Sequence, residues 1–334
     1  MLTKLLWTLP ISAAIYLMIA LGLVVSQRPS APEPGEGTGI AFDEAVSAGL
    51  EGLPDLLPYT ARDGETLFFR RYASARPSDR LVVLVHGSGW HGMQFHRMAG
   101  EIAAQGLADV VVPDLRGHGP APQRRGDIDH VGQFEEDLAD LIDRTRGDAK
   151  QVVLGGHSSG GGLVVRFAGG AYCQKADAFI LLAPFLKHDA PTTRANSGGW
   201  AHPAVRRIVG LTMLNMVGIR LLDHLPVIAF AMPRAVLDGP YGATATTRYS
   251  HRLLIGFSPR PDCGADLAAI DRPLLVVAGT ADESFRAELY EPTIVPHTGT
   301  GTYAALDGVT HMGVVFGNRG IAAVTGWLSG LPEV

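Results

Sequence analysis

The sequence of 334 residues contains little cysteine and no metal-binding pattern. Its two cysteines, Cys173 and Cys263, lie far apart, so two free thiols and one disulfide are both open. Twelve histidines are present, but the H-E-x-x-H pair of a zinc-protease helix does not occur. These features predict that the protein holds no metal.

The sequence also has no excess of positive charge, with 28 Lys and Arg against 33 Asp and Glu. The formal net charge is -5, and no long run of lysine or arginine occurs, so the sequence gives little electrostatic support for nucleic-acid binding. We find no internal repeat and no low-complexity stretch. The length suits one large domain with a sizeable core and an inserted subdomain, and no feature indicates an oligomeric state.

Charge is absent altogether from residues 5–27, which are mostly apolar. About 21 residues in a helix would rise about 32 Å, which matches the hydrocarbon thickness of a bilayer. We predict a transmembrane anchor over residues 1–28. Lys4 and Arg28 flank it almost evenly, and the free amino terminus favours an extracytoplasmic location for the rest of the chain. The alternative is a cleaved signal peptide and a secreted protein, although the apolar part of such peptides is usually about 7–15 residues.

Residues 29–55 read as a linker and leading segment, because residues 29–39 are rich in Pro, Gly, Ser and Glu. Short apolar runs then alternate with helical patterns such as the one over residues 131–142. The later runs are continuously apolar, as in strands covered on both faces. The sequence therefore predicts the α/β class, with a mostly parallel sheet flanked by helices. The expected strands are residues 67–69, 81–85, 110–112, 152–154, 179–182, 274–277 and 302–306.

The alternation stops between residues 187 and 271, where no strong strand is evident. A loop of that length needs structure of its own. We predict an inserted, mainly helical cap over residues 187–271, with the core formed by residues 56–186 and 272–334. The alternative is a set of ordinary helices covering one face of the sheet.

The candidate chemistry centres on Gly-His-Ser-Ser-Gly at residues 156–160. This G-x-S-x-G pattern follows a strand and opens a helix, which is the setting that exposes a nucleophilic serine. In this architecture an acid and then a histidine follow the serine, each beyond the carboxyl end of a later strand. Asp282 and His311 stand at those places. We therefore predict Ser158 as nucleophile, His311 as base and Asp282 as the acid that orients it.

Other residues compete for these roles. Asp189 is the second candidate acid, and Asp282 could instead cap a helix. Asp307 is too near His311 in the chain for the required geometry. His297 precedes the last strand and would lie at the opposite edge of the sheet.

An acyl-transfer site also needs donors for the oxyanion. We expect one to be the backbone N–H of Ser159, at the start of a helix. The second is the N–H of Ser88, preferred over that of Gly89, in the small-residue loop 86–89. His86 and His157 are expected to pack and orient these loops. Residues 114–119 are expected to form a structural turn whose arginine pairs locally.

Together, residues 86–89, 114–119 and 156–160, the Asp282 loop and His311 resemble the α/β-hydrolase fold family. The resemblance covers residues 56–331 and is nearest to monoglyceride lipases, lysophospholipases and serine aminopeptidases. It implies a cofactor-independent serine hydrolase that cleaves an acylglycerol-like or lysophospholipid-like ester through an acyl-enzyme. Ser159 and Pro120 depart from the usual pattern of that branch. Epoxide hydrolases and haloalkane dehalogenases use an aspartate nucleophile, so Ser158 argues against both.

Two other functions are open. An aminopeptidase would need an acidic group in the cap for the free amine, and Asp262 and Asp266 are the candidates. A catalytically silent, membrane-tethered binding module is the other. Several apolar residues of the cap could line an acyl pocket or simply pack in the core: Leu211, Met213, Met216, Ile228 and Phe230.

Overall fold

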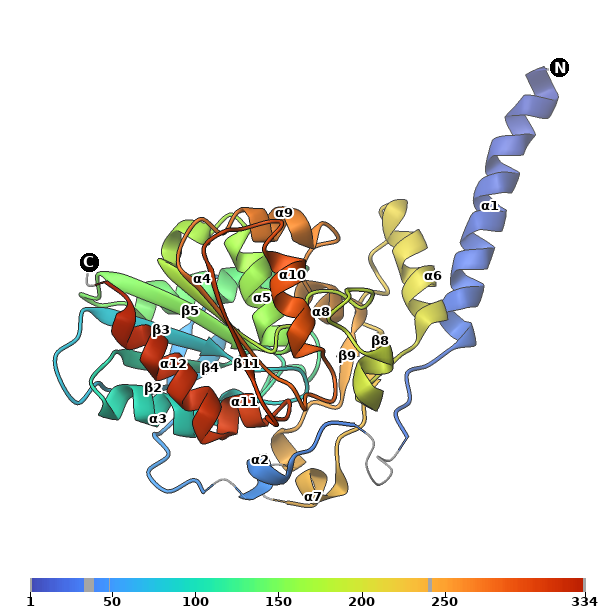
Figure 1. The fold of residues 1–334 in the computed structure, drawn as a ribbon. Helices are drawn as coiled ribbons and strands as arrows, with labels where there is room; N and C mark the ends of the chain where they lie inside the picture. Colours follow the sequence, from blue (N-terminus) through green and yellow to red (C-terminus); the bar gives the residue numbers. More distant parts are fainter. Residues whose placement is uncertain (1, 33–38, 48, 240–241, 333–334) are drawn as a thin grey trace.

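The computed structural model describes residues 2–32, 39–47, 49–239 and 242–332 (Figure 1). Eight strands form the central sheet in the order β1-β2-β4-β3-β5-β6-β10-β11. The pairs β1–β2 and β2–β4 are antiparallel and the other neighbouring pairs are parallel, which confirms the predicted sheet. The strands are β1 (Leu57–Thr60), β2 (Thr66–Tyr72), β3 (Arg80–Val85), β4 (Asp109–Asp114), β5 (Gln151–His157), β6 (Ala178–Leu182), β10 (Leu274–Gly279) and β11 (Gly301–Leu306).

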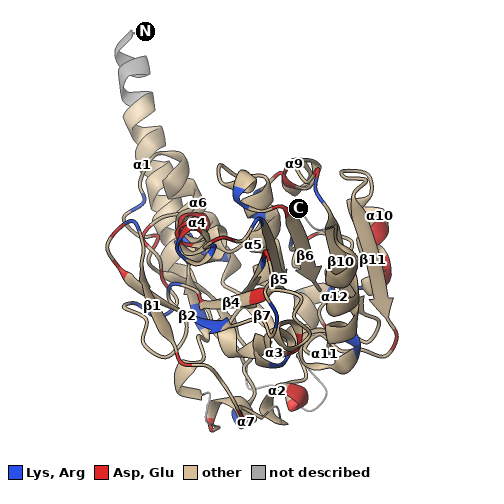
Figure 2. Ribbon diagram, turned by 90° about the vertical axis from the view of Figure 1, so that its left-hand side faces the viewer, with Lys and Arg blue, Asp and Glu red and all other residues tan. Residues whose placement is uncertain are grey.

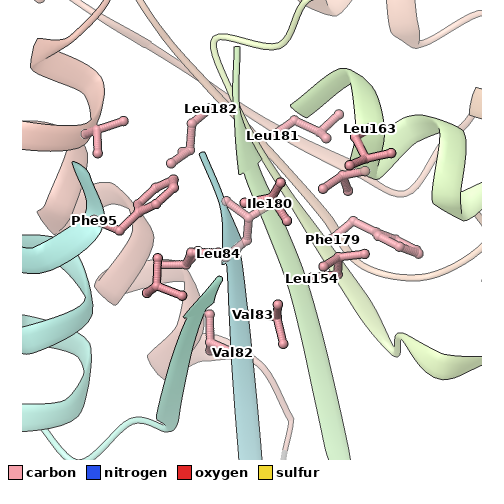
Figure 3. Close-up of a cluster of buried hydrophobic side chains, with 14 of the residues drawn as sticks. Val82, Val83, Leu84, Phe95, Leu154, Leu163, Phe179, Ile180, Leu181 and Leu182 are labelled. Atoms are coloured by element: carbon pink, nitrogen blue, oxygen red, sulfur yellow. The ribbon is translucent and has the colours of Figure 1, made fainter. Parts of the chain in front are cut away.

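The central strands form the core because both of their faces are covered. Every residue of β3, β5, β6 and β10 is buried, which explains why these runs are continuously apolar. Figure 3 shows side chains of β3, β5 and β6 packed against one another and against Phe95 and Leu163. The prediction missed β1, which has four residues of which only Tyr59 is buried.

Helices lie on both faces of the sheet (Figure 1). Helices α3 (His96–Ala104), α11 (Gly313–Phe316) and α12 (Asn318–Gly330) pack together on one face. Helices α4 (Gln133–Thr145), α5 (Ser159–Ala168) and α9 (Cys263–Ala268) pack together on the other. The remaining short helices of the core are α2 (Asp43–Ser47) and α10 (Tyr290–Ile294), with 3-10 turns at Gly92–Phe95, Cys173–Lys175 and Ala287–Leu289.

The segment between β6 and β10, here called the cap segment, corrects one expectation. It contains a three-stranded antiparallel sheet of β7 (Ala201–Pro203), β8 (Pro226–Phe230) and β9 (Arg248–Ser250), so the prediction of no strand there is wrong. Four of the five residues of β8 are buried, which removes the alternation that would have revealed the strand. The segment also has helices α6 (Val205–Met216), α7 (Arg234–Leu237) and α8 (His251–Gly256), and 3-10 turns at Ala195–Gly199 and Gly242–Thr244. Helix α9 belongs to the same segment of the chain but packs against α5 of the core.

Helix α1 (Leu2–Ser26) extends away from the rest of the protein (Figure 1). Its Leu9–Ser26 stretch is long and apolar enough to cross a membrane, a test that a signal sequence also passes. In Figure 2 the part of α1 that is not drawn in grey shows no charged residue, in contrast to the domain. The domain end of α1 lies against α6, where Ala20 and Val24 are buried.

Candidate active site

The predicted nucleophile lies in a strained turn between a strand and a helix. β5 ends at His157 and α5 begins at Ser159. Ser158 between them has φ 54° and ψ -121°, a conformation that side chains other than glycine rarely adopt. A Cβ at Gly156 would overlap the backbone of Gly160, so glycine is needed where the turn closes. The strand, the turn and the helix therefore hold Ser158 as the G-x-S-x-G pattern requires.

The structure brings Asp282 and His311 together. Asp282 follows β10, His311 follows β11, and Nδ1 of His311 lies 2.8 Å from Oδ2 of Asp282. Both side chains are buried. The other oxygen of Asp282, Oδ1, accepts hydrogen bonds of 2.8 Å from the backbone N–H groups of Ser284 and Phe285. Both oxygens of the carboxylate thus have hydrogen-bond partners. Because Nδ1 of His311 faces this carboxylate, Nε2 is the ring nitrogen that can act as the base.

His311 packs beside the Ser158 turn. Nε2 of His157 donates to the carbonyl oxygen of His311 at 3.1 Å, and the centroids of the two imidazole rings are 4.5 Å apart. Burial lowers the pKa of His157 well below its ordinary value, so its ring is neutral and its role is to pack against His311. The Phe285 ring lies 5.3 Å from that of His311 and lines one cavity together with Ser158.

The loop after β3 lies close to the same serine. A Cβ at Gly87 would lie 3.2 Å from Cβ of Ser158. The N–H of Gly87 donates to Gln94 Oε1 at 3.2 Å, and that of Gly89 donates to Tyr249 Oη at 2.6 Å. The backbone N–H groups of Gly87 and Gly89, on either side of Ser88, therefore donate to protein side chains. Ser88 itself lines the cavity with Ser158 and Ser159.

A chain of hydrogen bonds supports this loop from behind. The Tyr249 hydroxyl lies 2.7 Å from Nε2 of His118, whose Nδ1 lies 3.0 Å from the Arg116 carbonyl oxygen. His86 accepts from the N–H of Leu115 at 3.1 Å, and its other ring nitrogen bonds the carbonyl of Gly87. Burial lowers the pKa of His86 to about 4 and that of His118 well below its ordinary value, so both rings are neutral.

Arg116 corrects an expectation, since it does not pair within its own turn. It pairs with Asp137 of α4 at 2.8 Å, with Asp63 at 3.0 Å and with Glu65. Asp63 and Glu65 belong to the β1–β2 hairpin region, so this arginine joins three separate segments. The turn of residues 114–119 is structural, as predicted, but its partners are distant in the sequence.

The cavity beside Ser158 is lined mainly by apolar side chains and serines, and none of its described lining residues is charged. Ile228 and Phe230 of β8 line it, with Trp200 and Phe185. Of the other apolar residues of the cap segment considered above, Leu211 packs against α1, Met213 bonds Tyr16 of α1 through its carbonyl, and Met216 is exposed. The full described lining is Ser88, Ser158, Ser159, Phe185, Ser197, Trp200, Ala201, Ile228, Phe230, Tyr249, Leu254, Phe257, Ser258, Ser284 and Phe285.

The acidic candidates of the cap segment do not reach this cavity. Asp262 caps α9 by accepting from the N–H of Ala265 at 3.0 Å, and Asp266 pairs with Arg260 at 2.8 Å. Cys173 and Cys263 are free thiols in this structure.

The alternative acids and base also lie elsewhere. Asp189 is exposed and pairs with Lys187 at 3.3 Å. Asp307 is exposed and accepts from Thr280 Oγ1 at 3.2 Å. His297 is exposed beside Gly264.

Sequence reasoning missed Glu283 at the site. Its Oε2 accepts from the backbone N–H of His311 at 2.9 Å, and its Oε1 accepts from the N–H of Ala41 at 3.0 Å. One carboxylate thus ties the histidine loop to the segment that precedes α2. Its position next to Asp282 is the only signal in the sequence that could have drawn attention to it.

This sheet, with its turn between β5 and α5 and its acid and histidine beyond later strands, defines an α/β hydrolase. A family model described as serine aminopeptidase, S33, matches residues 76–291. The chain belongs to this family.

Curated relatives match only part of their length. The monoacylglycerol lipase of Mycolicibacterium smegmatis is 34% identical over 113 residues, which is 33% of this chain and 39% of the lipase. Non-heme chloroperoxidase CPO-A1 of Kitasatospora aureofaciens is 32% identical over 124 residues, or 37% of this chain and 42% of that protein. The chain thus spans about two fifths of these relatives.

Solved structures match over more of the chain. A soluble variant of the Saccharomyces cerevisiae monoglyceride lipase aligns with a TM-score of 0.64 and 17% identity, covering 91% of this chain and all of that one. The Paleococcus ferrophilus monoacylglycerol lipase aligns with a TM-score of 0.59 and 20% identity, covering 78% and 98%. At these identities the likeness shows the shared fold.

Proposed function

We propose that the protein is a serine hydrolase that cleaves a carboxylic ester through an acyl-enzyme intermediate. The observation that carries the proposal is the 2.8 Å bond between His311 Nδ1 and Asp282 Oδ2, buried beside the turn that holds Ser158. A histidine oriented in this way by an acid is the base that a serine nucleophile needs.

In the proposed mechanism, Nε2 of His311 takes the proton of Ser158 as its hydroxyl oxygen attacks the ester carbon. The N–H groups of Ser88 and Ser159 stabilise the resulting oxyanion. His311 then returns the proton to the leaving alcohol, and water repeats the cycle to release the acid. Asp282 orients His311 and stabilises the imidazolium. Each step uses groups of this chain and water alone.

The cavity favours an ester over a peptide with a free amino terminus. An ammonium group needs a carboxylate or an equivalent partner, and the described lining residues contain no charged side chain. The apolar lining suits an acyl chain, and a relative in part of its length is named monoacylglycerol lipase. We therefore favour an acylglycerol-like or lysophospholipid-like substrate. The cavity has a volume of about 70 Å³, so its lining must move before a long acyl chain can enter.

We also propose that α1 is retained as a membrane anchor, with the catalytic part outside the cytoplasm. Residues 187–271 would form the cap, and residues 56–186 and 272–334 the core. Removing α1 as a signal peptide would uncover the apolar cluster of Leu211, Leu214 and Val227, which Ala20 and Val24 cover. That cost supports an uncleaved helix over a secreted protein.

The test is a substrate panel for the full chain and two variants, Ser158→Ala and Ser329→Ala. Ser329 is exposed in α12 and serves as the matched control. The panel holds p-nitrophenyl esters of increasing chain length, a monoacylglycerol, a lysophospholipid and aminoacyl arylamides. We expect ester turnover that prefers acyl chains longer than about eight carbons and that Ser158→Ala alone abolishes. Turnover confined to arylamides would favour the aminopeptidase, and no turnover by the folded protein would favour a binding module.

A further inference from the structure

Helix α6 lies antiparallel along the domain end of α1. The backbone N–H of Arg206 donates to Gln27 Oε1 at 2.8 Å, and Nε of Arg207 donates to the Val24 carbonyl at 3.0 Å. Further along, the Tyr16 hydroxyl donates to the Met213 carbonyl at 2.9 Å. The contacts therefore run from residue 27, just after α1, back to residue 16 as α6 runs from residue 206 to residue 213, and Figure 1 shows the two helices side by side.

The two helices fit closely. A Cβ at Gly210 would lie 2.5 Å from the Ala20 carbonyl oxygen and 2.8 Å from a Val24 methyl group. Such close approach of backbones at a small residue is typical of helices that pair within membranes. The domain end of α1 is thus a packed part of the cap segment.

The length of α1 decides how deep this pair must lie. Only residues 5–15 separate Lys4 from the part of α1 that α6 covers, and eleven helical residues rise about 16 Å. The hydrocarbon core of a bilayer is about 30 Å thick. If α1 crosses the membrane, part of the α6-covered half must enter the hydrocarbon, and α6 enters with it.

The surface of α6 and the following turn is suited to that environment. We call residues 205–221 the cap arm. Residues 208–219 carry no charge, and Arg206, Arg207 and Arg220 are the only charged residues of the arm. Met216 and Leu221 at its tip are 78% and 82% exposed, and they belong to a group of exposed apolar side chains of the kind that marks a contact with a membrane or another protein. Val205, Val209, Val217 and Ile219 are exposed as well. Arg206 and Arg207 donate to the carbonyl oxygens of Ser26 and Val24, and the long side chain of Arg220 allows its charged group to lie away from the apolar surface.

We propose that the cap arm is immersed in the lipid leaflet that faces the catalytic domain, next to α1. The arm is then a second membrane attachment, and it holds the cap against the bilayer. Leu254 links the arm to the catalytic cavity, because it lines that cavity and also packs against the cluster of Ala20, Val24, Leu211, Leu214 and Val227. The proposal rests on α1 being a retained anchor, and it places the acyl-binding wall of the cavity at the membrane surface, where a lipid ester resides.

The test measures the depth of single labels in the full chain. Cys173→Ser and Cys263→Ser remove the native thiols, and a nitrobenzoxadiazole dye is attached at Met216→Cys or Leu221→Cys. Met18→Cys, 64% exposed on α1, reports on the anchor. Val46→Cys, 43% exposed on α2, is the control far from the arm (Figure 1). Each protein is reconstituted in phosphatidylcholine vesicles with or without doxyl-labelled phosphatidylcholine.

We expect doxyl lipid to quench the dyes at positions 216, 221 and 18 at least threefold more than the dye at position 46. Quenching at position 18 without quenching at 216 and 221 would overturn the immersed arm while leaving the anchor intact. No quenching at position 18 would overturn the anchor and the arm together. Blue-shifted but unquenched dyes at 216 and 221 would assign the arm to a second copy of the chain, which also overturns the proposal. Labelling of Ser158 by an active-site probe is independent of all three results.

A functional variant gives a second readout. Met216→Glu with Leu221→Glu places charge at the tip, far from the groups assigned to catalysis. We expect turnover of a monoacylglycerol in vesicles to fall about tenfold while turnover of a water-soluble p-nitrophenyl ester stays unchanged. A variant that turns over the monoacylglycerol in vesicles as fast as the native chain does would contradict the proposal.

Discussion

At Asp282 each carboxylate oxygen has its own partners. Oδ2 faces Nδ1 of His311, and Oδ1 accepts from two backbone N–H groups, those of Ser284 and Phe285. The loop that follows Asp282 thus orients the carboxylate independently of His311. Because different oxygens bond the loop and the histidine, a substitution can remove the negative charge and leave the loop in place.

The substitution Asp282→Asn is expected to do so. The amide oxygen can still accept from the two backbone groups, which leaves the NH₂ group facing Nδ1 of His311. Nδ1 must then accept, the proton moves to Nε2, and His311 can no longer take the proton of Ser158. We expect kcat for a p-nitrophenyl ester to fall by about 10³- to 10⁴-fold.

Thermal unfolding serves as the control for this variant, and its midpoint should stay within a few degrees of the native value. A fall in kcat of less than tenfold in a folded Asp282→Asn protein would contradict the role assigned to Asp282.

The residues of the candidate site differ in how far the sequence revealed them. Ser158, Asp282 and His311 were predicted because their order and their places after strands follow a general pattern. Glu283, Tyr249 and Trp200 were not, because each acts through contacts with segments far away in the chain. Tyr249 bonds Gly89, which lies 160 residues earlier. No local pattern marks such a residue.

Among the elements, the turn from β5 into α5 depends on a close approach of backbones. A Cβ at Gly160 would overlap the carbonyl oxygens of Val85 and His86 at the end of β3. Backbone atoms of a central strand cannot move aside as a flexible side chain can. The second glycine of the motif is therefore required for packing α5 against β3.

The pair Gly160→Ala and Gly326→Ala tests this requirement. Gly160→Ala should destabilise the protein by about 3 kcal/mol, the upper end of the usual cost of overpacking. Gly326 lies in α12 with open space at its Cβ, and alanine there should stabilise the helix by about 0.5–1 kcal/mol. The measurement is the thermal midpoint, expected to fall by several degrees for Gly160→Ala and not to fall for Gly326→Ala. Equal midpoints for the two variants would contradict the packing argument.

Element prediction succeeded where the apolar pattern is strong. The seven expected strands correspond to β2, β3, β4, β5, β6, β10 and β11, and the helical pattern over residues 131–142 corresponds to α4. β8 escaped because a short, fully apolar run looks the same in a strand and in a buried helix. The pairing of α6 with α1 also escaped, because hydrophobic periodicity shows that a helix has an apolar face but not which element covers it.

At the scale of the whole molecule, the interior holds several neutral histidines. Burial lowers the pKa of His86 to about 4 and that of His91 to about 3, and it lowers the pKa values of His118 and His157 well below the ordinary value. In the unfolded chain the same groups titrate near 6.5. Burial also raises the pKa of Asp137 to about 6 and that of Asp114 above its ordinary value, which acts in the opposite direction.

Stability should therefore fall as the pH falls from about 6.5 towards 4. In that range the four histidines bind protons in the unfolded chain but stay neutral in the folded protein. The free energy of unfolding therefore decreases with decreasing pH. The two aspartates offset part of this excess, which leaves a slope on the order of 1–3 kcal/mol per pH unit. Unfolding midpoints measured in detergent at pH 7.5, 5.5 and 4.5 test it. A midpoint that stays constant or rises on acidification would contradict the neutral interior.

The central claim is that Ser158 is an activated nucleophile, and covalent labelling with a fluorophosphonate probe tests it most directly. Such a probe reacts with a serine only where a base removes the hydroxyl proton and donors stabilise the oxyanion. We predict one probe per native chain, located on the peptide that contains Ser158, no label in Ser158→Ala, and full labelling of the Ser329→Ala control. A folded native chain that takes no label, or a Ser158→Ala chain labelled as well as the native one, would contradict the account.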